Sequence, residues 1–458
     1  MRAILNAFRT LAVVSASVIA SCKSLDAPDF RATSLSELTG NPSATVVATA
    51  TQGLPLVTRD LAVGTSYGGM VVTFGEIGRE GFGLDPDNPD QQARRLVTPT
   101  RSLGQEEWRV GYQLLRQATL VLHATDGVTE WSDAEKESVR GWTKTFMAYC
   151  LLEIINVFDQ SGAAIGFDRA VSDPLPAIVS KAQVFAKILQ LLDEARQHLV
   201  AAGSTAFPFS PSAGFADFST PAAFLQVNRA IRARVDVYLQ NWATALTDLT
   251  ASFIDTTAAM SFGAYHSFSG NSGDEPDPLY DPLPRTQVAH PSTITDAQLR
   301  ADGSPDLRAT QKTSTIPPRV LNGITATLKW AQYKSPNDPV PLIKNEELIL
   351  LRAEANFQLG NRAAALADIN TVRVNSGGLA AIPDPGNPGM LNEILYNRRY
   401  SLLWEGGHRW IDMRRYGRLA QLPRDRPGDI VIPYAPLTDA ECLARSPQPP
   451  GCTIPAGL

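Results

Sequence analysis

The sequence predicts a mainly α-helical protein with loop-rich insertions. Apolar residues recur at helical spacing in several long segments, strand signals are weak, and the 33 prolines and 33 glycines concentrate in the connections. A length of 458 residues allows two or three domains. Because the helical patterns do not separate into blocks, we expect one helical domain over residues 46–458.

The helical pattern occurs in eight segments. They span residues 105–125, 132–158, 179–201, 221–239, 242–254, 344–359, 362–374 and 390–405. The second begins with Ser132 and Glu135, which have the spacing of a capping box. In such a box each side chain accepts a backbone N–H at the start of the helix, so this start is the best defined of the set.

Two pairs of these helices have the pattern of a repeated unit. Ala233 and Ala245 are twelve residues apart in one pair, and Ala353 and Ala365 have the same spacing in the other. Small residues at these positions let two antiparallel helices approach closely. The pattern resembles tetratricopeptide repeats, which are helix–turn–helix units that stack into an α–α superhelix.

The N-terminus is typical of an exported protein. Residues 1–21 contain two arginines and a short apolar stretch that cannot span a bilayer, as in a secretory signal peptide. The segment ends in Ile-Ala-Ser before Cys22 and resembles a bacterial lipobox, which implies cleavage before Cys22 and lipidation of its thiol. A plain signal peptide followed by a chance cysteine is the alternative. The polar residues 22–45 then predict a tether.

Net charge and the other three cysteines give further expectations about partners and compartment. Removal of residues 1–21 changes the formal net charge from −5 to −7, so nucleic acid is not an expected partner. Cys150 lies in an apolar helical run and is expected to be a small buried hydrophobe. Cys442 and Cys452 flank a Pro-rich loop and are candidates for a disulfide in an oxidising compartment.

Residues 391–418 combine an apolar helical stripe with charges on the same side. Arg398 and Glu405 are seven residues apart, which is two helical turns, and Arg409 and Asp412 follow. Ionised groups on an apolar face need partners, because burying one unpaired costs several kcal/mol. We therefore expect these four residues to form a buried, mutually paired network that holds the fold.

This segment resembles the C-terminal motif of the RagB/SusD family of nutrient-binding outer-membrane lipoproteins. The common family form is E-R-R-x-E-L-x-F-E-G-x-R-W-x-D-L-R-R. The matching positions are Arg398, Arg399, Leu402, Trp404, Glu405, Gly406, Arg409, Trp410, Asp412, Arg414 and Arg415. Asn397 and Ser401 replace two glutamates, and Gly407 lengthens the turn by one residue.

The resemblance continues in the helices before this motif. Trp108 and Tyr112 occupy the expected places of the family's early helix, and residues 350–360 are similar to its R-A-E-A-x-x-x-L-G segment. The resemblance implies a fold with tetratricopeptide-like repeats on one side and a shallow ligand surface on the other. It also implies a TonB-dependent transporter barrel of the SusC type as partner, and no enzymatic activity or cofactor.

Signals for catalysis and metal binding are weak. Gly64-Thr65-Ser66-Tyr67-Gly68 fits the G-x-S-x-G nucleophile elbow, with His290 or His408 as a possible base, but no alternating βα pattern surrounds it. The five histidines have no metal-ligand spacing. The acidic run at Asp85, Asp87 and Asp90 lacks the spacing of a calcium-binding EF-hand loop and predicts a solvated loop.

Two loop-rich regions predict a binding surface. They carry aromatic rings beside polar groups, a combination that suits sugars and peptides. The candidates are Tyr67, Phe74, Arg79 and Phe82 in the first region and Tyr265, His266, Phe268 and Tyr280 in the second. Each aromatic could instead pack in the core or anchor its loop.

The preferred hypothesis is a surface lipoprotein of the outer membrane that binds an oligomeric glycan or peptide and delivers it to the transporter. A tetratricopeptide-type scaffold for envelope assembly is one alternative, and a secreted hydrolase that uses Ser66 is another. The chemistry of the ligand is not determined by the sequence.

Overall fold

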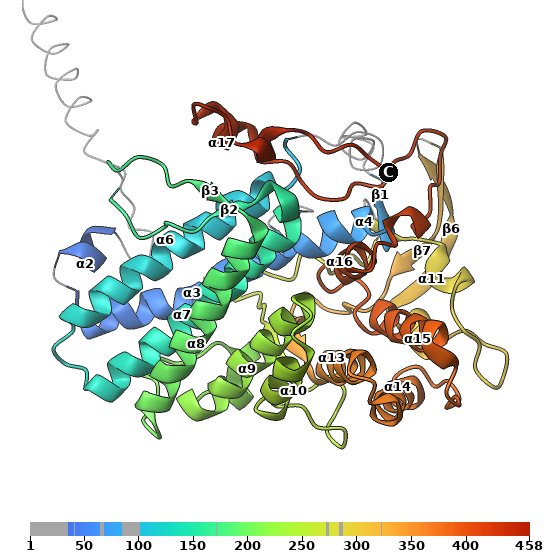
Figure 1. Ribbon diagram of the computed structural model, residues 1–458, viewed down its shortest axis with the longest axis horizontal. Coiled ribbons are helices and arrows are strands. Elements are labelled where there is room, and N and C mark those ends of the chain that lie inside the picture. Colours follow the sequence, from blue (N-terminus) through green and yellow to red (C-terminus); the bar gives the residue numbers. More distant parts are fainter. Residues whose placement is uncertain are drawn as a thin grey trace, which may run out of the picture.

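The computed structural model describes residues 35–40, 42–64, 68–84, 101–170, 172–271, 274–283, 287–321 and 323–458 (Figure 1). The predicted signal peptide, Cys22, Ser66, Tyr67, Asp85, Asp87 and Asp90 lie outside these ranges. No helix in the described part of the chain is long and apolar enough to cross a membrane.

Helices dominate the structure, as the sequence predicts. The longer ones are α3 (Ala44–Val63), α6 (Gln105–Gly127), α7 (Asp133–Phe158), α8 (Lys181–Ala202), α9 (Pro221–Tyr238), α10 (Trp242–Thr250), α13 (Asn345–Gln358), α14 (Arg362–Asn375), α15 (Gly386–Ser401) and α16 (His408–Arg415). Shorter ones are α2 (Leu35–Thr39), α4 (Gly75–Ile77), α11 (Ser292–Thr295), α12 (Leu307–Lys312) and α17 (Asp439–Leu443). A π-helical turn, η1 (Met70–Phe74), precedes α4.

The start of α7 confirms the predicted capping box. The side chain of Ser132 accepts from the backbone N–H of Glu135, and the Glu135 carboxylate accepts from the N–H of Ser132. The same arrangement at Ser180 and Gln183 begins α8. Both boxes satisfy backbone donors that a helix start otherwise leaves free.

Helix α3 was not predicted, and its first residues together with α2 fall inside the expected tether 22–45. Pro55 lies within α3. Proline has no backbone N–H and usually interrupts a helix, so its presence argued against a helix over these residues. Val47, Leu54 and Leu61 are nevertheless spaced by seven residues and are fully or almost fully buried. Packing of this face against α6 and α7 stabilises the helix despite the proline.

The repeat prediction is confirmed in atomic detail. Helices α9 and α10 pack together, as do α13 and α14, and α10 packs on α13 (Figure 1). In the first turn, the backbone and side-chain nitrogens of Asn241 donate to Asp236. Asn361 and Asn356 make the same two bonds in the second turn, 120 residues later. The alanines at the helix crossings, Ala233, Ala245, Ala353 and Ala365, have no exposed surface.

Strands form small antiparallel sheets beside the helices. One sheet has the order β1-β5-β7-β6, with β1 (Gly81–Gly83), β5 (Gln287–Ala289), β6 (Thr313–Leu321) and β7 (Ile324–Trp330). The others pair β2 (Ala163–Ala164) with β3 (Ile178–Val179), and β4 (Gly263–His266) with β8 (Val340–Lys344). In β1 and β5, Gly83 pairs with Gln287 across 204 residues of sequence.

The main hydrophobic core includes residues from Leu38 in α2 to Cys452 near the C-terminus. Cys150 is buried in it, and the thiol donates to the carbonyl oxygen of Gly111 at 3.2 Å. Cys442 and Cys452 form a disulfide that holds the segment around α17. The helices and this C-terminal segment share this core, whereas the buried residues of the four-stranded sheet form two smaller clusters beside it.

Candidate ligand-binding site

The structure places five of the eight predicted ligand-binding residues in the protein interior. Phe74 has no exposed surface and stacks on Trp410, with ring centroids 5.0 Å apart. Phe82 packs against His290 at 4.7 Å. The guanidinium of Arg59 lies over the Phe268 ring, with the guanidinium carbon 5.1 Å from the ring centroid. In this conformation these rings are buried against other protein groups and expose little surface on which a ligand could stack.

Arg79 and His266 are also buried. The Arg79 guanidinium donates to the carbonyl oxygens of Ile77, Pro423 and Ile430, so it ties the C-terminal segment to the turn after α4. Burial lowers its pKa. Burial lowers the pKa of His266 to about 3, so that imidazole is neutral at physiological pH. Both residues have surroundings that suit a structural role.

Two of the remaining candidates are partly exposed. The Tyr265 hydroxyl donates to the carbonyl oxygen of Ser261, and burial raises its pKa to about 12. Tyr280 lies in the loop between β4 and β5, between Leu279 and Asp281. Tyr67 lies outside the described residues.

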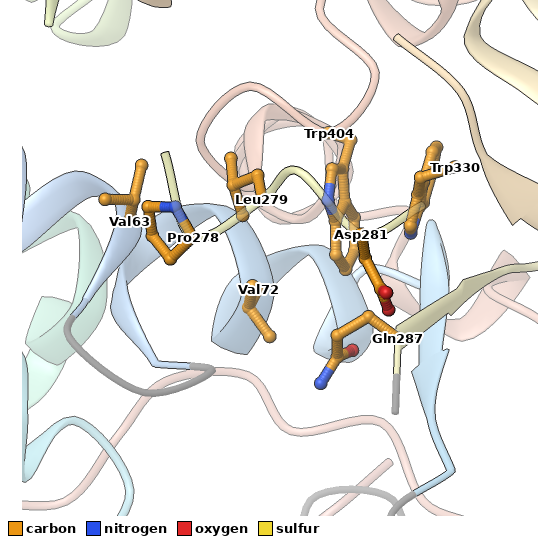
Figure 2. A pocket seen from close by; sticks show the side chains of 8 residues that line it. All are labelled: Val63, Val72, Pro278, Leu279, Asp281, Gln287, Trp330 and Trp404. Carbon is orange, nitrogen blue, oxygen red and sulfur yellow. The ribbon is translucent and has the colours of Figure 1, made fainter. Parts of the chain in front are cut away.

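A narrow cleft lies where the two predicted loop-rich regions meet (Figure 2). Val72 of η1 comes from the first region, and Pro278, Leu279 and Asp281 come from the second. Val63 at the end of α3, Gln287 of β5, Trp330 of β7 and Trp404 complete the lining. The two regions meet here, and the tryptophans that line the cleft come from other parts of the chain.

Trp330 and Trp404 form one wall of the cleft. Their rings are stacked, with centroids 4.4 Å apart and planes 20° from parallel. Trp404 lies in the turn between α15 and α16 with a positive φ of 59°, which is unusual for a bulky residue. Its carbonyl oxygen accepts from Gln332 and Tyr333, and its N–H donates to Glu80. These bonds hold the backbone in this conformation.

Glycines make room for the Trp404 ring. A Cβ atom at Gly75 would lie 2.7 Å from the ring, and one at Gly81 would lie 2.8 Å from it. Neither distance is tolerated without a shift of the indole. Gly75 and Gly81 belong to the loop-rich region 64–84, so their positions explain part of its glycine content.

Polar atoms in the cleft lack partners. Gln287 is 8% exposed, and neither its amide nitrogen nor its amide oxygen has a hydrogen-bond partner among the described residues. The indole nitrogen of Trp330 also has none there. A buried polar group without a partner costs roughly 1–3 kcal/mol, so each of these groups needs a partner, which a water molecule or a ligand can supply. The cleft thus offers donors and acceptors, including the Asp281 carboxylate, beside an apolar wall.

The enclosed part of the cleft is small. Its volume is about 20 Å³, which admits a hydroxyl or hydroxymethyl group but no complete sugar ring. A ligand in this conformation would therefore place one small polar group inside and keep the rest at the mouth. The chemistry that the cleft supports is hydrogen bonding next to an aromatic surface.

The charged residues of the C-terminal motif form ion pairs and hydrogen bonds in the segments next to Trp404. Glu405 follows Trp404 and binds the ammonium groups of Lys312 and Lys344, each at 2.7 Å. Arg398 Nε donates to Asp412 Oδ2 at 2.6 Å. Arg409 donates to the carbonyl oxygen of Arg79. Arg398, Arg409 and Asp412 are buried and the Glu405 side chain is 7% exposed, but of these four only Arg398 and Asp412 pair with each other.

Asn397 and Ser401, which stand where the family motif has glutamates, take part in a different set of buried polar contacts. Arg308 donates to the side chains of Asn397 and Ser401, where the family form has glutamates. Asp306 supplies the carboxylate for Arg308, and Glu346 accepts from Ser401. Gly407 adopts a positive φ of 67°, and a Cβ there would lie 2.5 Å from Phe74. The longer turn is therefore accommodated by close packing on η1.

Of the residues considered for catalysis, the structure describes His290 and His408 but not Ser66. His290 is held on both ring nitrogens, by Asp425 and by the N–H of Ser292. Burial lowers the pKa of His408 to about 4. Among the described residues, no group of three or more His, Cys, Asp or Glu side chains is arranged to hold a metal ion.

Comparisons with known proteins identify the class of this fold. Residues 259–441 match the sequence model of the SusD family. A SusD superfamily protein from Bacteroides vulgatus ATCC 8482 aligns with a TM-score of 0.65 at 16% identity, covering 90% of this chain and 99% of that one. A search of curated proteins finds no match.

Two further solved structures have the same fold. B. fragilis NanU aligns with a TM-score of 0.63 at 15% identity, covering 92% of this chain and 99% of its own. A laminarin binding SusD-like protein aligns with a TM-score of 0.62 at 16% identity, covering 89% of this chain and 99% of its own. The chain therefore has the fold of SusD-like proteins, and residues 259–441 match the sequence model of that family.

Sequence reasoning did not find Gln287, Trp330 or Trp404 as lining residues. Trp404 was assigned to the structural motif, and its stacking partner lies 74 residues earlier in the chain. One signal was available for Trp330, because a large aromatic ends an alternating strand, ITATLKW, just before a polar loop. Gln287 had no signal, since an isolated glutamine in a loop-rich region has no distinctive spacing.

Proposed function

We propose that this protein is a surface lipoprotein of the outer membrane that binds an oligomeric glycan and delivers it to a TonB-dependent transporter. The observation that carries the binding role is the pairing of Trp330 and Trp404 with the unpartnered amide of Gln287. A sugar has apolar C–H faces that suit an indole, and hydroxyl groups that both donate and accept.

The enclosed part of the cleft accommodates one small polar arm of a sugar. A hydroxymethyl arm fits the volume of about 20 Å³ with its CH₂ against the tryptophans and its hydroxyl on Gln287. The laminarin binding relative is consistent with a glycan ligand. Proteins of the SusD family are binding proteins, so no catalytic step is needed in this function.

The proposed lipid anchor is supported by the resemblance of the segment before Cys22 to a lipobox. A lipid on Cys22 would hold the protein at the membrane, with residues 22–34 leading to α2. Cys22→Ser should move the protein to the soluble fraction. If the variant stays with the membrane to the same extent, the lipid anchor is wrong, whereas the binding proposal is unaffected.

A substitution at Gln287 tests the binding role. Gln287→Leu has similar volume and removes two unsatisfied buried polar atoms, so the melting temperature should stay the same or rise. Affinity for the best ligand in a panel of soluble glycans that includes laminarin should fall by about tenfold or more by calorimetry. Gln358→Leu, on the exposed end of α13, is the matched control and should bind as the wild type does.

Three results would contradict this proposal. Unchanged glycan affinity in Gln287→Leu would remove the cleft from the binding site. Binding of peptides with no binding of any glycan would overturn the ligand class. Turnover of the ligand that disappears in Ser66→Ala would favour the hydrolase alternative, because a binding protein releases no product.

A further inference from the structure

A second cavity lies far from the Trp330 cleft and shares no lining residue with it. It is formed by the start of α6, by the segment between β2 and β3, and by α17 with the residues that follow, which lie together in Figure 1. Its volume is about 400 Å³, within the range of roughly 300–1,000 Å³ that small-molecule sites occupy. We call it the α6–α17 groove.

The groove has fixed walls. The Arg445 guanidinium binds Glu441 at 2.7 Å and donates to the carbonyl oxygen of Pro176, so it joins α17 to the β2–β3 segment. The Trp108 indole nitrogen donates to Glu441 at 3.2 Å. Disulfide Cys442–Cys452 anchors α17 in place. These bonds link three parts of the chain without filling the space between them.

Aromatic rings provide the apolar part of the lining. Trp108 and Tyr112 pack together with centroids 4.6 Å apart, and Phe167 lies on the β2–β3 segment. Tyr112 and Phe167 are partly exposed. The Tyr112 hydroxyl is engaged with both backbone groups of Ala164, so the ring is held in position. A flat ligand face has aromatic surface to pack on.

The charged part of the lining has an excess of arginine. Glu441 is neutralised by Arg445, whereas Arg116 and Arg169 form no ion pair within the described part of the chain. Arg116 donates from one terminal nitrogen to the carbonyl oxygen of Arg169, which leaves its other donors for a ligand. The nearby acids do not line the groove: Asp168 contacts His123, and Asp173 accepts from the N–H of Ala170.

We propose that the α6–α17 groove is a second binding site, for a sugar that carries a carboxylate. A guanidinium presents paired donors that match the two oxygens of a carboxylate, and the rings offer a surface for a sugar face. The choice of a sugar rests on the proposed glycan-binding function. The charge preference rests only on Arg116 and Arg169.

The test uses a matched pair of ligands. Digalacturonate and its methyl ester share the same sugar rings and differ in the charge of the carboxyl groups and in the added methyl groups, and their affinities for the wild-type protein are measured by calorimetry. Digalacturonate should bind at least about tenfold more tightly than the ester, and this advantage should shrink when the salt concentration rises. Arg116→Gln should remove most of the advantage while the melting temperature stays near the wild-type value.

The outcomes separate this site from the Trp330 cleft. Binding of digalacturonate that persists in Gln287→Leu but falls in Arg116→Gln and in Phe167→Ala supports the groove. Loss in Gln287→Leu alone overturns the groove and leaves the cleft standing. Equal affinity for acid and ester, or no binding at millimolar digalacturonate, overturns the proposal. Equally tight binding of a short poly-aspartate peptide overturns the assignment to a sugar.

Discussion

Arg398 and Asp412 form a buried ion pair that joins α15 to α16. Arg398 Nε lies 2.6 Å from Asp412 Oδ2, and the Arg398 side chain has no exposed surface. Asp412 also binds Arg415 at 2.9 Å, and Arg415 pairs with Glu354 of α13. The pair therefore connects the C-terminal motif to the repeat helices.

Removal of Asp412 should destabilise the fold strongly. Asp412→Ala leaves the Arg398 charge buried without its partner, and loss of one member of a buried pair costs about 3–5 kcal/mol. The free energy of unfolding is measured by urea titration. Asp384→Ala breaks an exposed pair with Arg362 and should change it little. Equal effects of the two variants would contradict the structural role.

Glu405→Ala should lower the melting temperature because two buried ammonium groups lose their carboxylate. Lys312 and Lys344 both lie 2.7 Å from Glu405. Adding Lys312→Met removes one of the unpaired charges and should restore part of the lost stability. An unchanged melting temperature together with lost glycan binding would make Glu405 a binding residue instead.

Glu153 should make stability depend on pH. Burial raises the pKa of this carboxyl from 4.5 to about 7, so the native state keeps its proton while the unfolded chain loses it. Stability from this group is therefore present below pH 4.5 and is lost as pH rises toward 7. Glu153→Gln should remove this slope and stabilise the protein at pH 8 by on the order of 3 kcal/mol.

The difference between the two Glu153 proteins isolates this carboxyl, because other groups titrate in both. Urea unfolding at several pH values provides the measurement. Parallel stability curves for the wild type and Glu153→Gln would show that the pKa of Glu153 is the same in the native and unfolded states, which would contradict the shift.

Ala365→Leu should disturb the repeat packing. Ala365 has no exposed surface where α14 crosses α13, and added methyl groups in a packed crossing cost roughly 1–3 kcal/mol. Ala363→Leu, two residues earlier on the exposed side of the same helix, is the control and should be nearly neutral. A thermal melt of both variants gives the comparison, and similar melting temperatures would mean that the crossing is loosely packed.

The sequence alone determined eight of the longer helices, but not α3 or α16, because helical periodicity and capping are local. The expected helix over 132–158 is α7, Asp133–Phe158. The prediction over 390–405 ran past the end of α15 at Ser401. Glu405 falls on the same side of the predicted helix as Arg398, so the helix was expected to reach it. In the structure Glu405 lies beyond the helix and pairs with Lys312 and Lys344 from other elements. Periodicity cannot detect partners that come from distant segments.

Tertiary structure decided the sheets and the cleft, because both depend on contacts between distant segments. β1 pairs with β5 across about 200 residues, and three-residue strands carry no recognisable pattern. Phe74 of η1 and Trp404 of the turn between α15 and α16 are both buried aromatic residues, yet one stacks on Trp410 and the other stacks on Trp330 and lines the cleft. The sequence determined that aromatic residues and glycines occur in these segments, and only the packing of distant segments decided which rings meet, because each partner comes from another part of the chain.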